Sequence, residues 1–472
     1  MAVFPAAEDI LRLAQKGPMR LKRQFASKLR LADLCLWTGF CVMLIGGTVL
    51  RHDAMAAESS ISEASIGVAH VPSAKSTDII RLSLDETIGL FLRQNLDLLT
   101  AKYGIESKKS QEVTARLFPN PVVFIGTLSS YTQGRTLSNG GQLFGQVQQL
   151  IELAGKRGYR IESAGFGTQS AEADFENVVR QVGFTVKDAY YRVQLAQRRL
   201  ALAEENRDRF SRILEINTIR FKKGYIAEVD LIRIRLQVID FQSQVIQSHQ
   251  DIETARADLR QLLRLSPAID LDLTTDLVFK RLDPDIKRLR TVAVEVRPDV
   301  RARRALFSQR EAELKLAKAY RIPDVTVGAG YAIQGSRGPD NPGQVAVNLG
   351  LPLPLFNRNQ GGIRQAEVGV QTAEADLDKT LNQVENQVDT AYRNLIQSRK
   401  LVEAFLGGVL DDARSTLTIV ERAYVRGGAT LLDLLDAART SRTIQQNYIE
   451  ALFNYQRNVF QLESAVGQEI AS

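Results

Sequence analysis

The sequence contains few of the side chains that usually bind metals or act as nucleophiles. Its 472 residues include two cysteines, three histidines, four methionines and one tryptophan. Both cysteines (Cys35 and Cys41), His52, the tryptophan and every methionine precede residue 56, so only His70 and His249 follow. Residues 57–472 therefore cannot form a disulfide or present a thiolate, and two distant histidines make neither a clustered metal site nor a catalytic triad. We expect no bound metal, no cofactor and no enzymatic activity.

The sequence also lacks a concentrated charge of one sign. The net charge is +7, but residues 1–56 hold eight basic and four acidic side chains. The remaining 53 basic and 50 acidic side chains almost balance. Nucleic-acid binding needs a concentrated basic face, so we expect no nucleic-acid partner.

One long apolar run occurs, and it lies near the start of the chain. Basic residues precede Leu34–Leu50, and the small-residue pattern Ala54-x-Ala56 follows it. This order predicts a secretory signal peptide over residues 1–56, with Met19 as an alternative start because its leader is more basic. The competing interpretation is a single transmembrane anchor. Cleavage would remove both cysteines, which excludes a lipid anchor on a mature N-terminal cysteine.

The chain is an internal duplication. Residues 221–231 read FKKGYIAEVDL and residues 424–434 read YVRGGATLLDL, an offset of 203. Residues 153–164 read LAGKRGYRIESA and residues 355–366 read LFNRNQGGIRQA, an offset of 202. A near-constant offset over most of a chain indicates two copies of one unit.

We place the two copies at residues 82–265 and 290–468. An extended segment, 57–80, precedes them, and a linker, 266–290, joins them. Each copy is predicted to contain a first helix, two strands, a long helix and a returning helix. The predicted first helices are 84–117 and 294–321, the long helices 156–221 and 363–424, and the returning helices 229–264 and 431–466.

The predicted strands alternate between apolar and polar or small residues. They cover about 119–131 and 141–152 in the first copy, and 323–334 and 343–355 in the second. Strict alternation over nine or ten residues is typical of a membrane-barrel strand, although a soluble, half-buried hairpin alternates in the same way. Four strands cannot close a barrel, and open edges are not tolerated in lipid, so several chains are needed.

These motifs together resemble the outer membrane efflux proteins of the TolC type. The stretches that carry the resemblance are LPLPLFNRNQGGI, AELKLAKAYRIPDVTVGAGY and YVRGGATLLDLLDAARTS, and the subfamily most similar is that of cobalt–zinc–cadmium resistance-nodulation-division systems. The resemblance implies a mainly α homotrimer in the outer membrane lipid. Its 12-stranded β-barrel, with four strands per chain, would continue into a 12-helix periplasmic α-barrel. It also implies a periplasmic adaptor, a membrane fusion protein, and an inner-membrane pump that supplies the energy.

The resemblance places a closed gate and the adaptor contact at the turns containing Gly224 and Gly427. Family aspartates that constrict the pore match Asp433 and Asp436, with Asp230 equivalent in the first copy. An acidic ring would favour cations. The alternative for Asp433 is a helix-capping role, because it stands three residues after a threonine.

Two further expectations concern residues beside this turn. Tyr424 matches an aromatic residue near the family gate, but it equally suits the core of a coiled coil. The family's basic gate partner is replaced by Ala429, and Arg422 and Arg426 are the nearby substitutes.

The stretch LPLPLFNRNQGG is predicted to join a barrel strand to a long helix. Pro352 and Pro354 cannot donate ladder hydrogen bonds, so they belong at a strand end. Gly361 and Gly362 are predicted to complete a polar corner before the helix begins at Ile363.

The predicted function is a passive exit duct of a tripartite efflux pump, with heavy-metal cations as the expected cargo. The alternatives are an outlet for drugs or for type I protein secretion, or a periplasmic coiled-coil adaptor without a pore. The scarcity of soft ligands means that any metal specificity would reside in the pump.

Overall fold

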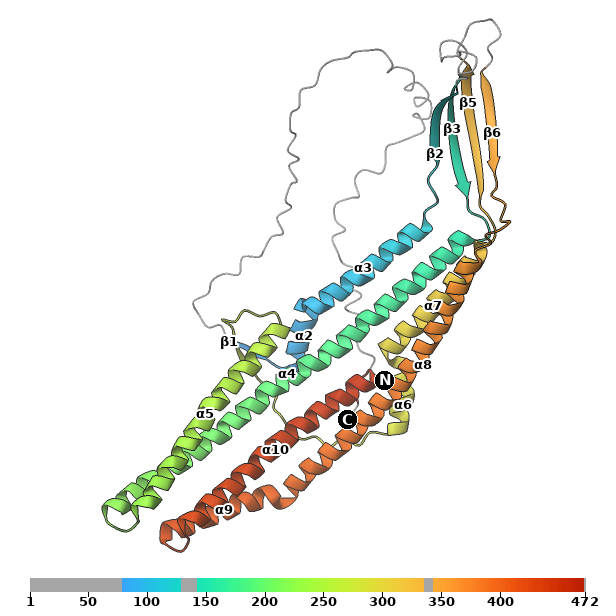
Figure 1. Cartoon of the computed structure of the whole chain (residues 1–472). Coiled ribbons are helices and arrows are strands. Elements are labelled where there is room, and N and C mark those ends of the chain that lie inside the picture. The colour runs from blue at the N-terminus through green and yellow to red at the C-terminus, as the bar shows by residue number, and fades with distance from the viewer. Residues whose placement is uncertain (1–78, 129–141, 335–342, 471–472) are drawn as a thin grey trace, which may run out of the picture. The chain divides into compact units, whose positions relative to one another are not determined.

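The computed structural model describes residues 79–128, 142–334 and 343–470. The predicted signal peptide, with its alternative start at Met19, and nearly all of the predicted extended segment lie outside these residues. The described chain repeats one order of elements, as Figure 1 shows. The first copy contains α2 (Leu84–Gln94), α3 (Leu96–Arg116), β2 (Val122–Leu128), β3 (Gln142–Ile151), α4 (Lys156–Lys222) and α5 (Glu228–Leu262). The second contains α6 (Ile286–Val296), α7 (Pro298–Ala319), β5 (Val325–Gln334), β6 (Gln344–Gly350), α8 (Gln360–Ala404), η3 (Phe405–Val409), α9 (Leu410–Arg426) and α10 (Leu431–Val466).

The first helix of each copy is divided in two, so the prediction of single helices over 84–117 and 294–321 is wrong. Asn95 has an extended ψ of 133°, and its side chain caps α3 by accepting hydrogen bonds from two backbone N–H groups. In the second copy Pro298 opens α7, and Arg297 before it has a ψ of 130°. A residue preceding proline avoids the helical region, which explains the break.

The long helix of the first copy is unbroken, but its counterpart is not. α4 runs for 67 residues, which corresponds to about 100 Å. The prediction of one uninterrupted helix over 363–424 is wrong, because η3 separates α8 from α9. Gly408 within it has a φ of +122°, a conformation that glycine adopts at little cost. A π-type bulge of this kind is a local interruption of the helical hydrogen-bond ladder.

The four longer strands form one antiparallel sheet in the order β2-β3-β5-β6. β3 pairs with β5 from Gln142↔Gln334 to Ile151↔Val325, so the sheet joins the two copies. β6 ends at Gly350, five residues before its predicted end. β2 and β6 form the two edges of the sheet, and neither has a second partner within the described chain.

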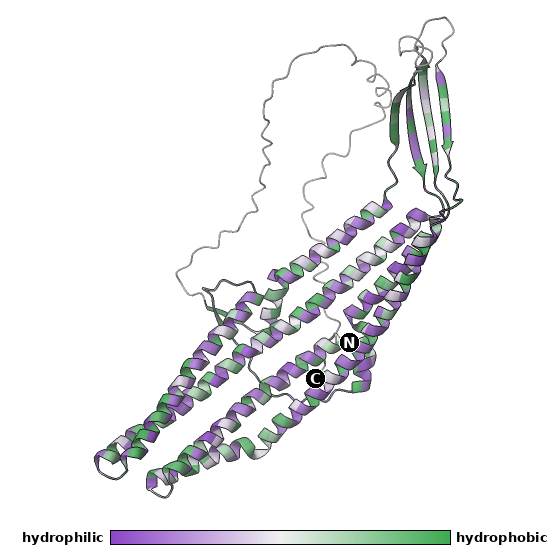
Figure 2. Cartoon of the chain, in the orientation of Figure 1, coloured by the Kyte–Doolittle hydropathy of each residue, from purple (hydrophilic) through white to green (hydrophobic). Residues whose placement is uncertain are grey.

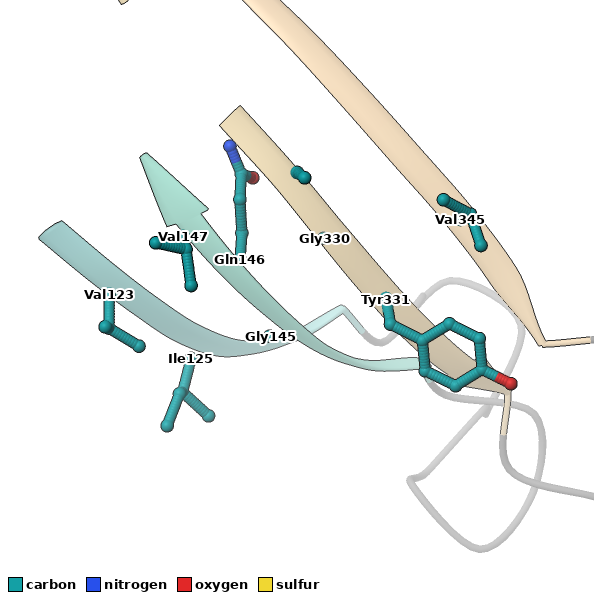
Figure 3. Close-up of a pocket in the computed structure, with 9 residues that line it drawn as sticks. Val123, Ile125, Gly145, Gln146, Val147, Gly330, Tyr331 and Val345 are labelled. Atoms are coloured by element: carbon teal, nitrogen blue, oxygen red, sulfur yellow. The ribbon is translucent and has the colours of Figure 1, made fainter. Parts of the chain in front are cut away.

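The strand register sorts the side chains into two faces, which can be followed in Figure 3. One face is mainly apolar and exposed: Ile125 is 78% exposed, Val345 77% and Leu349 74%. The other face carries amide and small side chains with some aromatic and aliphatic ones. The amides on it are Gln142, Gln146, Gln148, Gln344 and Asn348, and the glycines are Gly126, Gly328, Gly330 and Gly350.

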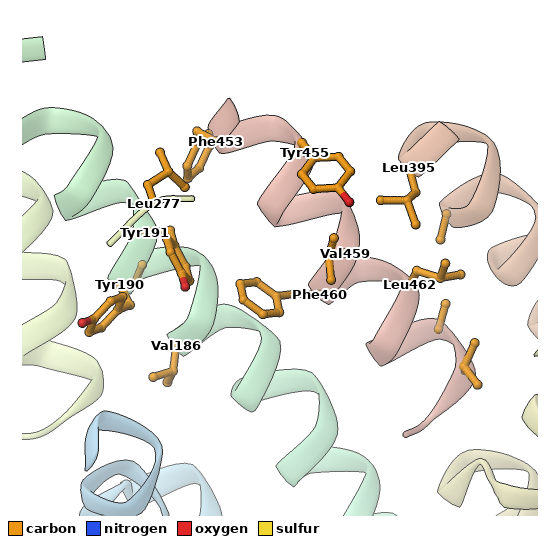
Figure 4. Close-up of a cluster of buried hydrophobic side chains, with 14 of the residues drawn as sticks. Val186, Tyr190, Tyr191, Leu277, Leu395, Phe453, Tyr455, Val459, Phe460 and Leu462 are labelled. Carbon is orange, nitrogen blue, oxygen red and sulfur yellow. The ribbon is translucent and has the colours of Figure 1, made fainter. Parts of the chain in front are cut away.

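The largest buried cluster lies where α4, α8 and α10 approach the linker, and Figure 4 shows its aromatic side chains. Tyr190 on α4 donates a 3.1 Å hydrogen bond to the Leu82 carbonyl, and its oxygen accepts one from the Thr275 amide. Tyr455 on α10 acts similarly, donating to the Lys280 carbonyl at 2.6 Å. The Tyr190 hydrogen bonds hold a short parallel sheet of β1 (Ile79–Leu82) and β4 (Asp270–Leu273), which the sequence analysis missed, and the Tyr455 bond holds the chain that follows β4.

Apolar and polar side chains are interspersed along every helix, as Figure 2 shows. In the described ranges, no helix combines the length and the apolarity needed to cross a membrane.

Candidate functional site

The two helix-to-helix turns each depend on a glycine with positive φ. Gly224 follows α4 with a φ of +74°, and Gly427 follows α9 with a φ of +83°. Both turns close with a hydrogen bond across five residues: Tyr225 N–H to the Arg220 carbonyl, and Gly428 N–H to the Ala423 carbonyl. A glycine at this position is the usual helix C-terminal signal, because side chains are strained there.

Asp433 is a helix-capping residue. Its carboxylate accepts hydrogen bonds from the Thr430 backbone N–H at 2.8 Å and the Thr430 hydroxyl at 2.7 Å. The Asp433 N–H in turn bonds the Thr430 hydroxyl, which completes a capping box. The side-chain and then the backbone hydrogen bond to Thr430 lower the pKa of Asp433. The carboxylate stays exposed and ionised at neutral pH, so the capping role does not remove its charge from the turn.

The other two acidic residues have different surroundings. Asp230 lies at the matching position of α5, and its carboxylate approaches Arg233 one turn later at 3.5 Å. The cap residue before α5 is Ala227, so Asp230 has no side-chain partner like Thr430. Asp436 is exposed on α10, one turn beyond Asp433. The structure places Asp433 and Asp436 beside the helix-to-helix turn between α9 and α10. Asp230 lies beside the turn between α4 and α5.

Tyr424 connects the two copies. Its phenol donates a 2.7 Å hydrogen bond to Oδ1 of Asn217, which is fully buried on α4. Asn217 also donates from Nδ2 to the Ile213 carbonyl at 2.8 Å, so both ends of its amide are used. Burial raises the pKa of Tyr424 above its ordinary value. Tyr424 is therefore both a core residue and a polar link between α9 and α4.

Two arginines on α4 strengthen this link, and the sequence analysis did not select them. Arg220 donates to the carbonyls of Tyr424 and Val425, and its guanidinium lies 5.8 Å from the Tyr424 ring centre. Arg209 pairs with Glu421 on α9 at 2.8 Å. The predicted substitutes Arg422 and Arg426 are exposed instead. The internal duplication is the one sequence signal that bears on this link, because Arg220 and Val425 lie beside the equivalent turns of the two copies.

The predicted strand-to-helix joint is displaced toward the strand. Pro352 and Pro354 lie after the end of β6, as their missing N–H groups require. Gly361 and Gly362, however, belong to the first turn of α8, so the prediction that they precede the helix is wrong. The positive φ of +56° falls on Asn359, whose side chain donates to the Ala317 carbonyl at 2.8 Å. A Cβ on Gly362 would collide with the Asn359 side chain, so a larger residue there would have to displace Asn359 from its contact with Ala317.

The first copy builds its joint with a buried ion pair. Lys156 is 2% exposed, and its ammonium donates to Asp324 and to the Ile322 carbonyl, both at 2.6 Å. Asp324 also accepts from the Leu153 N–H at 2.9 Å. This pair fixes the start of α4 against the start of β5. No pattern in the sequence identified it, because the two residues are far apart in the chain.

Comparison with known proteins decides the family. The outer membrane efflux protein family matches residues 87–263 and 289–468. The chain belongs to the outer membrane efflux protein family. The two matched segments together cover most of the chain, and each corresponds to one copy of the duplication. The chain is accordingly an outer-membrane protein of a family of efflux channels, which leaves the adaptor interpretation without support.

Two relatives illustrate the range of this family. The chain is 25% identical over 395 residues to the cobalt-zinc-cadmium resistance protein CzcC of Cupriavidus metallidurans, covering 83% of this chain and 92% of CzcC. It is 23% identical over 341 residues to the outer membrane protein TolC of Escherichia coli, covering 68% of each chain.

Solved structures confirm the predicted fold. The outer-membrane channel OprN superposes with a TM-score of 0.68 at 20% identity, covering 81% of this chain and 89% of that one. CusC superposes with a TM-score of 0.69 at 16% identity, covering 82% and 92%. The TolC-type fold expected from the repeated motifs is therefore the fold of this chain.

Proposed function

We propose that three copies of this chain form a closed duct across the outer membrane and the periplasm. The observation that carries this proposal is the pair of open edges on an apolar-faced sheet. Among the residues that the structure describes, β2 and β6 both lack an outer partner, and backbone groups at such edges must be paired in lipid. Pairing of β6 of one copy with β2 of the next satisfies both edges, and three copies supply 12 strands. A head-to-tail contact of this kind forms a closed ring when the rotation from one copy to the next is a third of a full turn, as in a cyclic trimer.

The helices offer a matching pair of edges. α5 leaves large apolar side chains exposed at helical spacing, and large apolar side chains are also exposed on the segments from α8 to α9. These are Val229, Ile232, Leu236, Ile239 and Ile246 on α5, and Leu401, Leu406, Val409, Ile419 and Val425 on the other edge. Packing of one set against the other in the neighbouring copy would bury both and complete a 12-helix barrel.

The duct works with a periplasmic adaptor and an inner-membrane resistance-nodulation-division pump, and the pump provides the energy. The turns at Gly224 and Gly427 form the periplasmic end that meets the adaptor. Asp433 and Asp436, repeated by threefold symmetry, make an acidic constriction there, and Asp230 adds to it. Tyr424 and Arg220 hold this end closed by fixing α9 against α4.

Heavy-metal cations are the proposed cargo. Support comes from the similarity to CzcC over 92% of that protein's length and from the acidic turn, which favours cations over anions. Export of drugs or of a secreted protein is the alternative, supported by the similarity to TolC and to the toxin and drug export protein A of Aggregatibacter actinomycetemcomitans.

A deletion strain tests the proposal directly. The strain should become sensitive to zinc, cobalt or cadmium and keep its tolerance of several unrelated drugs. Sensitivity to drugs alone would favour the alternative cargo. Purified protein should conduct ions in planar bilayers, and protein that inserts without conducting would contradict a duct of any kind.

A further inference from the structure

The ends of the strands that adjoin the helices differ sharply in charge from the strands themselves. β2, β3, β5 and β6 contain no Asp, Glu, Lys or Arg. The nine residues that flank each strand at its helical end contain seven basic and two acidic side chains, over residues 113–121, 152–160, 316–324 and 351–359. The basic excess is therefore concentrated at one level of the fold, where strands give way to helices.

Both acidic side chains at this level are already used inside the protein. Glu152 binds Arg160 with two hydrogen bonds, at 2.6 and 3.0 Å. Asp324 binds the buried Lys156. A third basic residue, Arg116, lies 3.4 Å from Glu112 on its own helix. The remaining basic side chains are Arg157, Lys318, Arg321 and Arg358, and within the described chain none of them lies within 4 Å of a carboxylate.

These unpaired cations lie among exposed apolar side chains. The guanidinium of Arg157 stacks 4.1 Å from the ring centre of Phe118, which is 69% exposed. The Arg358 guanidinium donates to the Pro354 carbonyl at 3.2 Å, and the nearby Phe356 is 90% exposed. Arg321 is exposed beside the exposed Ile322. Arginines next to exposed aromatic and aliphatic groups suit the boundary between hydrocarbon and phosphate, where a long side chain keeps its apolar stem in contact with lipid.

We propose that Arg157, Arg321 and Arg358 bind the phosphates of anionic phospholipid in the periplasmic leaflet of the outer membrane. The partner follows from two observations: the apolar sheet face is continuous with this level, and the charge left over here is positive. Guanidinium groups bind phosphate through paired N–H donors. β3 and β5 have ten residues each, within the about nine to eleven that a tilted strand needs to span the hydrocarbon layer, so their helical ends lie near the phosphates. The proposal rests on the placement of the sheet in the membrane.

Native mass spectrometry of the purified full chain tests it. Protein in detergent is mixed with phosphatidylglycerol or with zwitterionic phosphatidylcholine, and the bound lipids are counted. The wild type should retain phosphatidylglycerol preferentially. The triple variant Arg157→Gln, Arg321→Gln, Arg358→Gln should lose this preference. The affinity for phosphatidylglycerol should fall about fivefold for each charge removed.

Two matched variants separate charge from folding. Replacing the same three arginines with lysine keeps the charge and should keep most of the preference. Lys102→Gln, Lys379→Gln, Arg414→Gln removes three exposed charges from helices away from the strand ends, and should leave the preference unchanged. Equal retention of phosphatidylglycerol by the wild type and the glutamine triple variant overturns the proposal, and so does displacement of the lipid by millimolar inorganic phosphate. If the same preparation conducts ions in bilayers, that failure leaves the duct itself intact.

Discussion

The phenol of Tyr424, at the end of α9, donates a 2.7 Å hydrogen bond to Oδ1 of Asn217, which is fully buried on α4. Tyr424→Phe removes the donor and leaves a buried amide oxygen unpaired. We expect the variant to lose about 1–3 kcal/mol of stability and to show larger or more frequent openings in bilayers. Tyr103→Phe is the matched control, since Tyr103 is 63% exposed and should tolerate the change. Urea unfolding and single-channel recording measure the two effects, and equal behaviour of both variants would refute the link.

Asp433 and Asp436, beside the turn between α9 and α10, should contribute differently to stability. Asp433→Ala removes the capping box and should cost about 1 kcal/mol in stability. Asp436→Ala should leave stability unchanged, because its exposed carboxylate caps nothing. Together the two changes should weaken block of the conductance by multivalent cations. Unchanged block in the double variant would dismiss the acidic constriction.

Gly407 and Gly408 form a matched pair within the bulge between α8 and α9. A Cβ added by substitution at either position would have open space around it, with no neighbouring side chain within 4 Å. Only Gly408 has a positive φ. Gly408→Ala should therefore destabilise the protein by about 1–2 kcal/mol. Gly407→Ala should be neutral or stabilise it by up to about 1 kcal/mol. Thermal unfolding of both variants distinguishes them, and a destabilised Gly407→Ala would contradict the geometry.

The buried pair at the first joint should matter far more than an exposed pair nearby. Lys156→Met leaves Asp324 without its cation and should cost about 3 kcal/mol. Lys315→Met breaks a 2.9 Å pair with Glu162 in which both side chains are at least 36% exposed, and should cost under about 1 kcal/mol. Chemical denaturation measures both values. Similar losses would mean that the buried pair is not specifically important.

Stability at low pH should depend on Asp299. Burial by itself would raise the pKa of this carboxyl, but the hydrogen bonds and charge of Arg297, with that of Arg180, hold it below its ordinary value of 3.8. Burial and the neighbouring Arg297 also lower the pKa of Arg180, to about 10. Since the folded pKa of Asp299 is depressed, the stabilisation is complete above pH 3.8 and is lost as the pH falls through the lowered value.

Asp299→Asn should therefore remove part of the acid-induced loss of stability, and it should cost about 3 kcal/mol at neutral pH because Arg297 is fully buried. Asp283→Asn is the control, as its pKa is also lowered, by Arg399, but its side chain is 69% exposed. Denaturation curves measured from neutral pH to well below pH 3.8 provide the measurement. Parallel curves for the wild type and Asp299→Asn would be incompatible with this assignment.

The positions of the breaks show why the sequence predicted element types better than their limits. A long apolar periodicity predicts a helix, but Asn95 and Arg297 interrupt it through caps and a following proline, which are local signals of one or two residues. The bulge at Gly408 lies in a stretch whose periodicity continues on both sides. Each break depends on a single backbone conformation that periodicity does not reveal.

The sequence by itself determined the duplicated unit, its two amphipathic strands and its helical hairpins, because period-two and helical patterns and a constant offset are properties of neighbouring residues. It also determined the glycine turns, since glycine adopts the required positive φ at the least cost. Tertiary structure alone decided the pairing of β3 with β5, the parallel β1–β4 sheet and the bond between Tyr424 and Asn217. The same holds for Lys156 with Asp324. These contacts join residues far apart in the chain, and their free energy depends on burial that exists only after the two copies have packed together.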